Sequence, residues 1–258
     1  MGEVSYRPLI EDMVWSYSRV SCFEQCPYKF YTKYIYGQEE QEMFYASYGK
    51  FMHKLIEEYY KEGTSREDLK IKFLFDFSKE VKGFRPSDKI VRDYLEKGCN
   101  YFDTLEPFPF NMISVEEKVD FNIDEIPFVG VIDYFGEVDG EYVIVDNKSR
   151  DLKPRSTRKK PTLKDMELDS MLKQLYVYSA WVYQKYGKYP KYLCFNCFKE
   201  NVFIKEEFDI DKYNETIGWV KSVINMAMDE DRFPPYVDFF PCYYLCGFND
   251  ECDYWLCR

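Results

Sequence analysis

Two aspartates and a lysine could do chemistry together on a predicted β-hairpin. Asp133 lies in the segment GVID, and Asp146 and Lys148 lie in VIVDNKS on the returning strand. Because side chains alternate along a strand, Asp146 and Lys148 share one face. Two carboxylates that converge repel each other unless a cation lies between them, and oxygen ligands favour Mg²⁺ or Mn²⁺. The pattern therefore indicates either a salt bridge at a strand end or a metal site.

Further motifs give these residues a family context. The spacing G-x-x-D, followed about a dozen residues later by D-x-K, resembles the PD-(D/E)XK nucleases. Three more stretches resemble the RecB-like exonuclease branch of that superfamily, from about residue 16 to 252: SYSRVSCFEQCPYKFYTKY (16–34), YGKFMHKLIEEYY (48–60) and Gln174-x-x-x-Tyr178. They match its N-terminal serine and cysteine signature, its G-x-x-x-H motif and its Q-x-x-x-Y motif. The resemblance implies a restriction-endonuclease-like core.

The resemblance also implies a role for each matched residue. His53, the only histidine in the chain, would bind Mg²⁺ or Mn²⁺ together with Asp133, Asp146 and the backbone carbonyl of Asn147. Lys148 would orient or activate the attacking water and offset charge on the phosphate. Gln174 and Tyr178 would hold the active-site strand and the DNA backbone. One of Glu116 and Glu117, on the preceding strand, could support the metal site, and both could equally be solvated.

Four of the nine cysteines lie in the C-terminal segment CYYLCGFNDECDYWLC, at 242–257. Such clustering is hard to explain as core filling, and four thiolates suit either Zn²⁺ or an iron–sulfur cluster. AddB proteins and Cas-four CRISPR nucleases carry a [4Fe–4S] cluster, so the resemblance implies one here, on Cys26, Cys242, Cys246 and Cys252. The interval between Cys242 and Cys246 has three residues where the family usually has two. Cys257 is therefore an alternate ligand.

A basic segment follows the lysine directly. Residues 148–164, KSRDLKPRSTRKKPTLK, hold eight Lys or Arg and one Asp, in a chain of net charge −11. The ordinary explanation of such a run is a solvated loop. Its place beside the candidate active site favours a contact with DNA phosphates. The predicted DNA-binding residues are Arg150, Lys153, Arg155, Arg158, Lys159 and Lys160.

These residues must be positioned by helices and strands that the hydrophobic periodicity indicates. The predicted helices are 18–37, 44–61, one after Ser65, one after Ser87, 165–186 and 211–229. The predicted strands are 112–121, 127–138, 141–149, 192–198 and 202–210. This order predicts an α/β (α+β) fold with a central mixed sheet flanked by helices. We expect a single nuclease domain over 1–258, with a helical part (1–110), a core (111–230) and a Cys-rich tail (231–258).

Composition excludes several classes of protein. With 46% hydrophobic and 31% charged residues, the chain is not disordered. No apolar run approaches the ~20 residues that span a bilayer, and the N-terminus does not read as a signal peptide. Cysteines without a secretion signal predict a reducing, cytoplasmic compartment of a bacterial, archaeal or phage-infected cell. The acidic balance disfavours a protein that coats nucleic acid over its whole surface.

We therefore expect a metal-dependent exonuclease that acts on DNA with a free end. No G-x4-G-K-[ST] loop is present, so no ATP-driven helicase is built in. One alternative is a DNA-end-binding module that does not cut. Another is a CRISPR adaptation subunit that trims spacer precursors with a protein partner. A partner in recombination or repair would fit as well.

Overall fold

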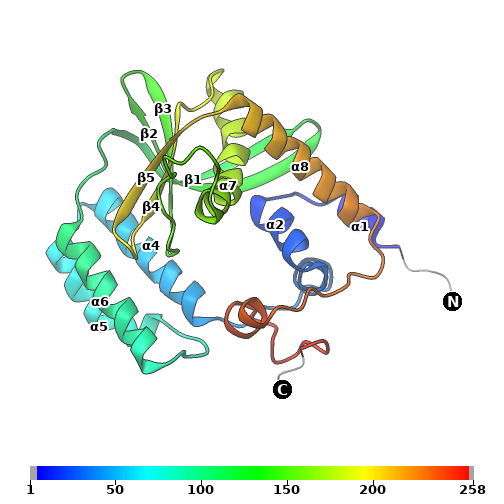
Figure 1. The fold of residues 1–258 in the computed structure, drawn as a ribbon, viewed down its shortest axis with the longest axis horizontal. Helices are drawn as coiled ribbons and strands as arrows, with labels where there is room; N and C mark the ends of the chain where they lie inside the picture. The colour runs from blue at the N-terminus through cyan, green and yellow to red at the C-terminus, as the bar shows by residue number, and fades with distance from the viewer. Residues whose placement is uncertain (1–4, 256–258) are drawn as a thin grey trace.

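The computed structural model describes residues 5–255 and places a five-stranded mixed sheet between two groups of helices (Figure 1). The strand order is β1-β2-β3-β4-β5, and all neighbouring strands are antiparallel except β3 and β4. The strands are β1 (Asn111–Ile123), β2 (Ile126–Val138), β3 (Glu141–Asn147), β4 (Tyr192–Cys197) and β5 (Val202–Glu207). The predicted mixed sheet flanked by helices is confirmed.

Two connections fix the order of the central strands. The predicted hairpin turn between β2 and β3 is present at Asp139 and Gly140, both at positive φ. Parallel strands need a crossover, and α7 (Leu163–Tyr186) supplies it between β3 and β4. This helix begins with a capping box between Thr162 and Asp165. The crossover places the middle of α7 against the end of β3, where Gln174 contacts Asp146 and Lys148.

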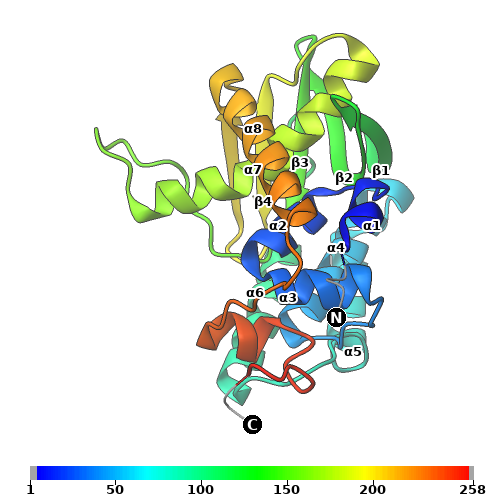
Figure 2. The same ribbon diagram turned by 90° about the vertical axis from the view of Figure 1, so that its right-hand side faces the viewer.

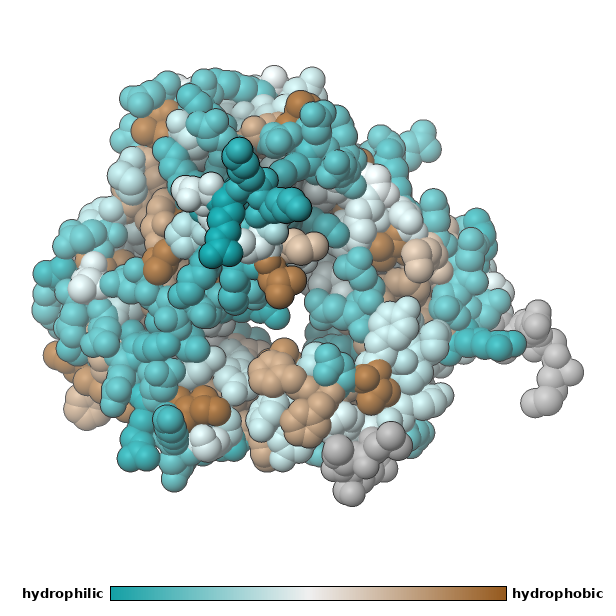
Figure 3. All heavy atoms as spheres, viewed as in Figure 1, coloured by the Kyte–Doolittle hydropathy of each residue, from teal (hydrophilic) through white to brown (hydrophobic). Residues whose placement is uncertain are grey.

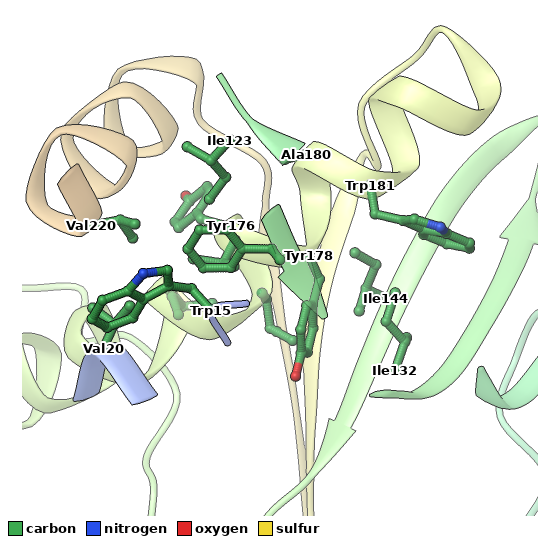
Figure 4. Close-up of a cluster of buried hydrophobic side chains, with 14 of the residues drawn as sticks. Trp15, Val20, Ile123, Ile132, Ile144, Tyr176, Tyr178, Ala180, Trp181 and Val220 are labelled. Atoms are coloured by element: carbon green, nitrogen blue, oxygen red, sulfur yellow. The ribbon is translucent and has the colours of Figure 1, made fainter. Parts of the chain in front are cut away.

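The two faces of the sheet belong to different hydrophobic cores. One face packs with α2, α7 and α8 (Ile210–Met228), in the core that Figure 4 shows around Trp15 and Trp181. The other face packs with α4 (Phe44–Glu62), α5 (Arg66–Glu80) and α6 (Asp88–Thr104). Along β3, Ile144 belongs to the first core, and Val143 and Val145 belong to the second. The alternation that the sequence predicts for this strand is therefore confirmed.

The N-terminal part differs from the predicted single helix over 18–37. It consists of α1 (Arg7–Glu11), α2 (Tyr17–Gln25), α3 (Pro27–Phe30) and the π-helical turn η1 (Tyr31–Ile35). The break falls at Cys26, whose backbone is extended at φ −162° and ψ 102°. A residue before proline is disfavoured in the helical region, so Pro27 divides the helix. Ser16 caps α2 by accepting a hydrogen bond from the backbone N–H of Arg19, so the helix begins one residue before the predicted start.

The C-terminal tail returns to the N-terminal helices. After the π-helical turn η2 (Pro241–Leu245), the carbonyl of Gly247 accepts a hydrogen bond of 3.0 Å from the backbone N–H of Gln41. The rings of Tyr28 and Tyr254 meet edge to face with centroids 5.0 Å apart. Figures 1 and 2 both show the red tail beside these blue helices, far from the C-terminal end of α8 that precedes it. The tail therefore packs against the segment of residues 28–41.

The space-filling view shows an opening at the centre of one face (Figure 3). In Figure 1 this opening lies between the sheet, α4 and the tail. Across residues 5–255, no helix is long and apolar enough to cross a membrane.

Candidate active site

His53 of α4, Glu116 of β1 and Asp133 of β2 form one group, which we call the metal group. Each offers a ligand atom, and these atoms lie within 4.8 Å of one another. His53 Nδ1 is 3.4 Å from Asp133 Oδ2, and its Nε2 is 3.1 Å from the carbonyl oxygen of Asn147. One nitrogen and several oxygens are donors that Mg²⁺ and Mn²⁺ accept. The donor set therefore fits a divalent cation.

The structure distinguishes Glu116 from Glu117, which the sequence left as equal candidates. Glu116 lies opposite Asp133 in the register of β1 and β2 and has a positive φ of 53°. Non-glycine residues seldom adopt this conformation, and such strain is concentrated at functional sites. Glu117 instead makes an ion pair with Lys185 at 3.3 Å. Glu116 is therefore the carboxylate of β1 that belongs to the metal group.

Burial and mutual repulsion raise the pKa values of the carboxylates. Asp133 is 8% exposed, and its pKa is raised well above the ordinary value by burial and by the charge of Asp146. The pKa of Glu116 is raised to about 7 by burial and by Asp133. Burial lowers the pKa of His53. In the absence of a metal ion, each of these pKa shifts favours the uncharged form of the side chain. A cation bound among these groups would instead favour the ionised carboxylates.

Asp146 and Lys148 lie on the α7 side of β3, as the alternation predicts. Gln174 of α7 joins them: its amide nitrogen donates to Asp146 Oδ1 at 2.7 Å, and its oxygen accepts from Lys148 Nζ at 2.8 Å. The ammonium also lies 2.6 Å from Asp146 Oδ2, a buried oxygen that makes no hydrogen bond. Asp146 is thus outside the 4.8 Å metal group, while its charge still acts on Asp133 and His53.

Asn147 connects the two halves of the site through its backbone. Its N–H donates to Asp133 Oδ2 at 2.7 Å, while its carbonyl faces His53. Its side-chain amide turns into the opposite core and donates to the hydroxyl of Tyr134 at 3.2 Å. Asn147 is buried and is held by Asp133 through its backbone and by Tyr134 through its side chain. These two contacts fix its carbonyl beside the metal group. The carbonyl oxygen of Asn147, which is the predicted backbone ligand, therefore lies next to the His53 ring.

Tyr178 lies one helical turn after Gln174 and is buried in the core of Figure 4. Its ring packs on Gly130, where an added Cβ would come within 2.5 Å of the ring. Burial and the charge of Asp146 raise the pKa of the Tyr178 phenol, which is also hydrogen-bonded to Gln174. The glycine of the G-x-x-D motif therefore makes room for the tyrosine of the Q-x-x-x-Y motif.

Four cysteines from both ends of the chain line one pocket, which we call the thiol pocket. They are Cys26, Cys242, Cys246 and Cys252. The Cys26 sulfur caps α3 by accepting from the backbone N–H of Lys29 at 3.4 Å. Within the described chain, no three cysteine sulfurs lie within 4.8 Å of one another. The alternate ligand Cys257 lies outside the described residues.

The basic loop between β3 and α7 projects from the molecule (Figure 2). Arg155 is held by Asp169 and Glu206, each at 2.7 Å. Lys153 pairs with Asp151 at 2.6 Å. The other predicted DNA-binding residues are exposed: Arg150, Arg158, Lys159 and Lys160. The loop is therefore fixed at its base by Arg155 and presents its cations at the tip.

A mixed sheet whose central hairpin carries G-x-x-D and D-x-K beside a histidine defines a nuclease of the PD-(D/E)XK class. The family model described as "PD-(D/E)XK nuclease superfamily" matches residues 14–253, and the chain belongs to this superfamily. A solved structure of similar fold is a "putative exonuclease" from Eubacterium rectale. It shares 15% identity at a TM-score of 0.52, with 91% of this chain and 90% of that chain covered. No match was found among curated proteins.

Proposed function

We propose that the protein is a metal-dependent DNA exonuclease of the RecB-like, Cas-four-like type. The metal group carries this proposal, because a nitrogen and two carboxylates lie within 4.8 Å beside an ion-paired lysine. The exonuclease name of the fold neighbour gives independent support. A protein partner in recombination, repair or CRISPR adaptation is compatible with this activity.

Each residue of the site would have one task in phosphodiester hydrolysis. His53, Glu116 and Asp133 would hold a divalent cation together with the Asn147 carbonyl, and Asp146 would complete the site. A bound Mg²⁺ or Mn²⁺ supplies a water of lowered pKa and polarises the phosphoryl oxygen.

Lys148 would direct its ammonium at the phosphate and stabilise the negative charge that develops there. Gln174 would hold both Lys148 and Asp146 in place through its two hydrogen bonds.

The thiol pocket would hold a structural [4Fe–4S] cluster. Four thiolates from two distant segments suit either the cluster or zinc. Zinc binds sulfur at ~2.3 Å in a tetrahedron, which would draw all four sulfurs close together. The cluster is favoured over zinc because Cys26 and the tail cysteines resemble the cluster ligands of the RecB-like branch. Either metal would join the N-terminal helices to the tail.

Digestion of end-labelled DNA tests the activity. Single and double strands labelled at the 5′ or the 3′ end are incubated with Mg²⁺, Mn²⁺ or EDTA. We expect stepwise shortening from an end with either metal and none in EDTA. Binding of DNA ends without any cleavage would instead identify a DNA-end-binding module and contradict the proposal.

A further inference from the structure

A second cavity, of about 560 Å³, lies beside the metal group between α4, α6 and the tail. We call it the aromatic cavity. Its size falls within the ~300–1,000 Å³ of pockets that bind small molecules. The residues that define it for this argument are Tyr45, Tyr94, Phe240, Ser149, Arg150 and Lys199. In Figure 1 the start of α4, α6 and the red tail approach one another here.

The aromatic cavity adjoins the metal group directly. Tyr45, Ala46 and Ser149 line both this cavity and the pocket that contains His53 and Glu116. Ser149 directly follows Lys148, so the segment that leaves the active site forms part of the cavity wall. Whatever binds in the cavity therefore lies next to a phosphate at the metal group.

Three aromatic side chains contribute to the cavity wall. The rings of Tyr45 and Tyr94 lie 5.5 Å apart at 57°, and Phe240 of the tail is 52% exposed. Stacking of a base on an aromatic side chain contributes roughly 1–3 kcal/mol and tolerates any sequence, because every base has a π face. Tyr94 is buried, so Tyr45 and Phe240 are the rings that offer a surface for a flat aromatic ligand.

The two acidic groups of the cavity pair with lysines outside it. Asp93 lies 3.7 Å from Lys97, and Asp151 lies 2.6 Å from Lys153. Lys199 lies over the ring of Tyr94, 4.3 Å from its centroid. With both aspartates paired in this way, Arg150 and Lys199 leave the cavity with positive charge, which suits a base flanked by phosphates.

We propose that the aromatic cavity binds one unpaired nucleobase of a DNA strand whose neighbouring phosphate lies at the metal group. The proposal rests on the proposed DNA cleavage and adds the requirement that the base next to the cleaved phosphate is unpaired. A base stacked and paired in a duplex cannot enter a side cavity without leaving the helix. The cavity thus makes the protein selective for single-stranded ends.

Binding of modified oligonucleotides tests the cavity. A fluorescent single-stranded oligonucleotide and a series with one abasic site at each position are titrated in EDTA, where metal-dependent cleavage does not proceed. The variants are Tyr45→Ala and Tyr45→Phe, with Phe75→Ala as the matched control, because Phe75 is an 83% exposed ring on α5. We expect about tenfold weaker binding for Tyr45→Ala and little change for the other two.

One abasic position should weaken binding to the wild type by a similar factor, and Tyr45→Ala should add little to that loss. Equal affinity of the wild type for all abasic oligonucleotides would overturn the proposal, whether or not a variant folds. Cleavage of the unmodified strand by the wild type with Mn²⁺ is measured in parallel. Failure of cleavage contradicts the proposed function. Cleavage by a protein that binds all the abasic oligonucleotides with equal affinity contradicts only the proposed role of the cavity.

Discussion

At the scale of single residues, Lys148 is the group on which cleavage depends most directly. We expect Lys148→Ala to lower the cleavage rate by at least about 100-fold, because loss of one charge-stabilising donor typically has this effect. Lys70→Ala is the control, since that lysine of α5 pairs with Asp103 of α6. Rates are measured on end-labelled DNA with saturating Mn²⁺. If Lys148→Ala cleaved DNA at the wild-type rate, the active site would have been placed wrongly.

Glu116 and Glu117 form a natural matched pair. Calorimetric titration with Mn²⁺ should show weaker binding for Glu116→Gln, which removes a ligand, and unchanged binding for Glu117→Gln. Equal affinities of the two variants would exclude Glu116 from the metal group.

The same pair predicts a pH effect on stability in EDTA. The pKa of Glu116 is raised to about 7, so ionisation destabilises the metal-free fold as pH rises from the ordinary carboxyl pKa through 7. Glu116→Gln should therefore raise the melting temperature at pH 8 and leave it nearly unchanged at pH 4. A lower melting temperature at pH 8 would contradict the assigned shift.

The sequence could predict Asp133, Asp146 and Lys148, because alternation along β3 is a local rule and both partners of the hairpin are visible in the chain. It could not choose between Glu116 and Glu117. Neighbouring residues of a strand face opposite sides, so the choice depends on the register of β1 with β2. That register is a long-range property that the motif around the two glutamates does not encode.

At the scale of elements, Asp165 fastens the basic loop to α7. Its carboxylate accepts from the backbone N–H of Ser156 and of Thr162, each at 2.7 Å. These bonds lower its pKa, so its contribution is fully present at neutral pH and is lost only as pH falls through the lowered value. Asp165→Ala should speed tryptic cleavage within the loop at pH 8, and Glu167→Ala should not. Equal cleavage rates would mean that the loop is held elsewhere.

The tip of the loop predicts a salt effect. Replacing Arg158, Lys159 and Lys160 by Ser should weaken DNA binding and reduce the slope of log K against log salt concentration by about 2–3, if each cation contacts one phosphate. Arg155 is left unchanged because it is held by Asp169 and Glu206. The slope is measured by titrating single-stranded DNA at several salt concentrations. An unchanged slope would identify the tip as a solvated loop.

The element boundaries show where local rules suffice. Caps at Ser65 and Ser87 follow from side-chain chemistry and are present as expected. The interruption at Cys26 was missed because the apolar spacing continues through it, whereas Pro27 acts on the backbone of the preceding residue. The turn η2 was not predicted at all, since a π-helical turn has no periodic signature of its own.

At the scale of the whole molecule, the thiol pocket joins segments more than 200 residues apart. Protein purified without oxygen should be brown and hold about four irons per chain, as expected for one cluster. Cys246→Ser should bleach it and increase hydrogen exchange in both α2 and the tail, while Cys194→Ser, a buried residue of β4 outside the pocket, should stay brown. A colourless wild-type protein that holds one zinc ion would contradict the iron–sulfur cluster. It would still agree with a metal that joins the N-terminal helices to the tail.

Long-range placement is the part of the fold that the sequence could not supply. Helical spacing predicted α4, α5 and α6, but it could not show that they cover the face of the sheet opposite to α7. Nor could it show that the tail passes beside α4, because those contacts depend on the shape of both cores. The aromatic cavity arises from this packing and has no counterpart in any motif.

The turn η2 has a consequence for how the protein is made. Phe240 and Leu245 face the aromatic cavity, while Cys242 and Cys246 of the same short segment face the thiol pocket. A ribosome completes the catalytic sheet before it adds this segment. A nascent or truncated chain with an assembled sheet therefore still lacks one wall of the cavity beside its metal group. If the proposed base cavity and cluster are correct, a chain that lacks the last cysteines should bind single-stranded DNA more weakly than the full chain.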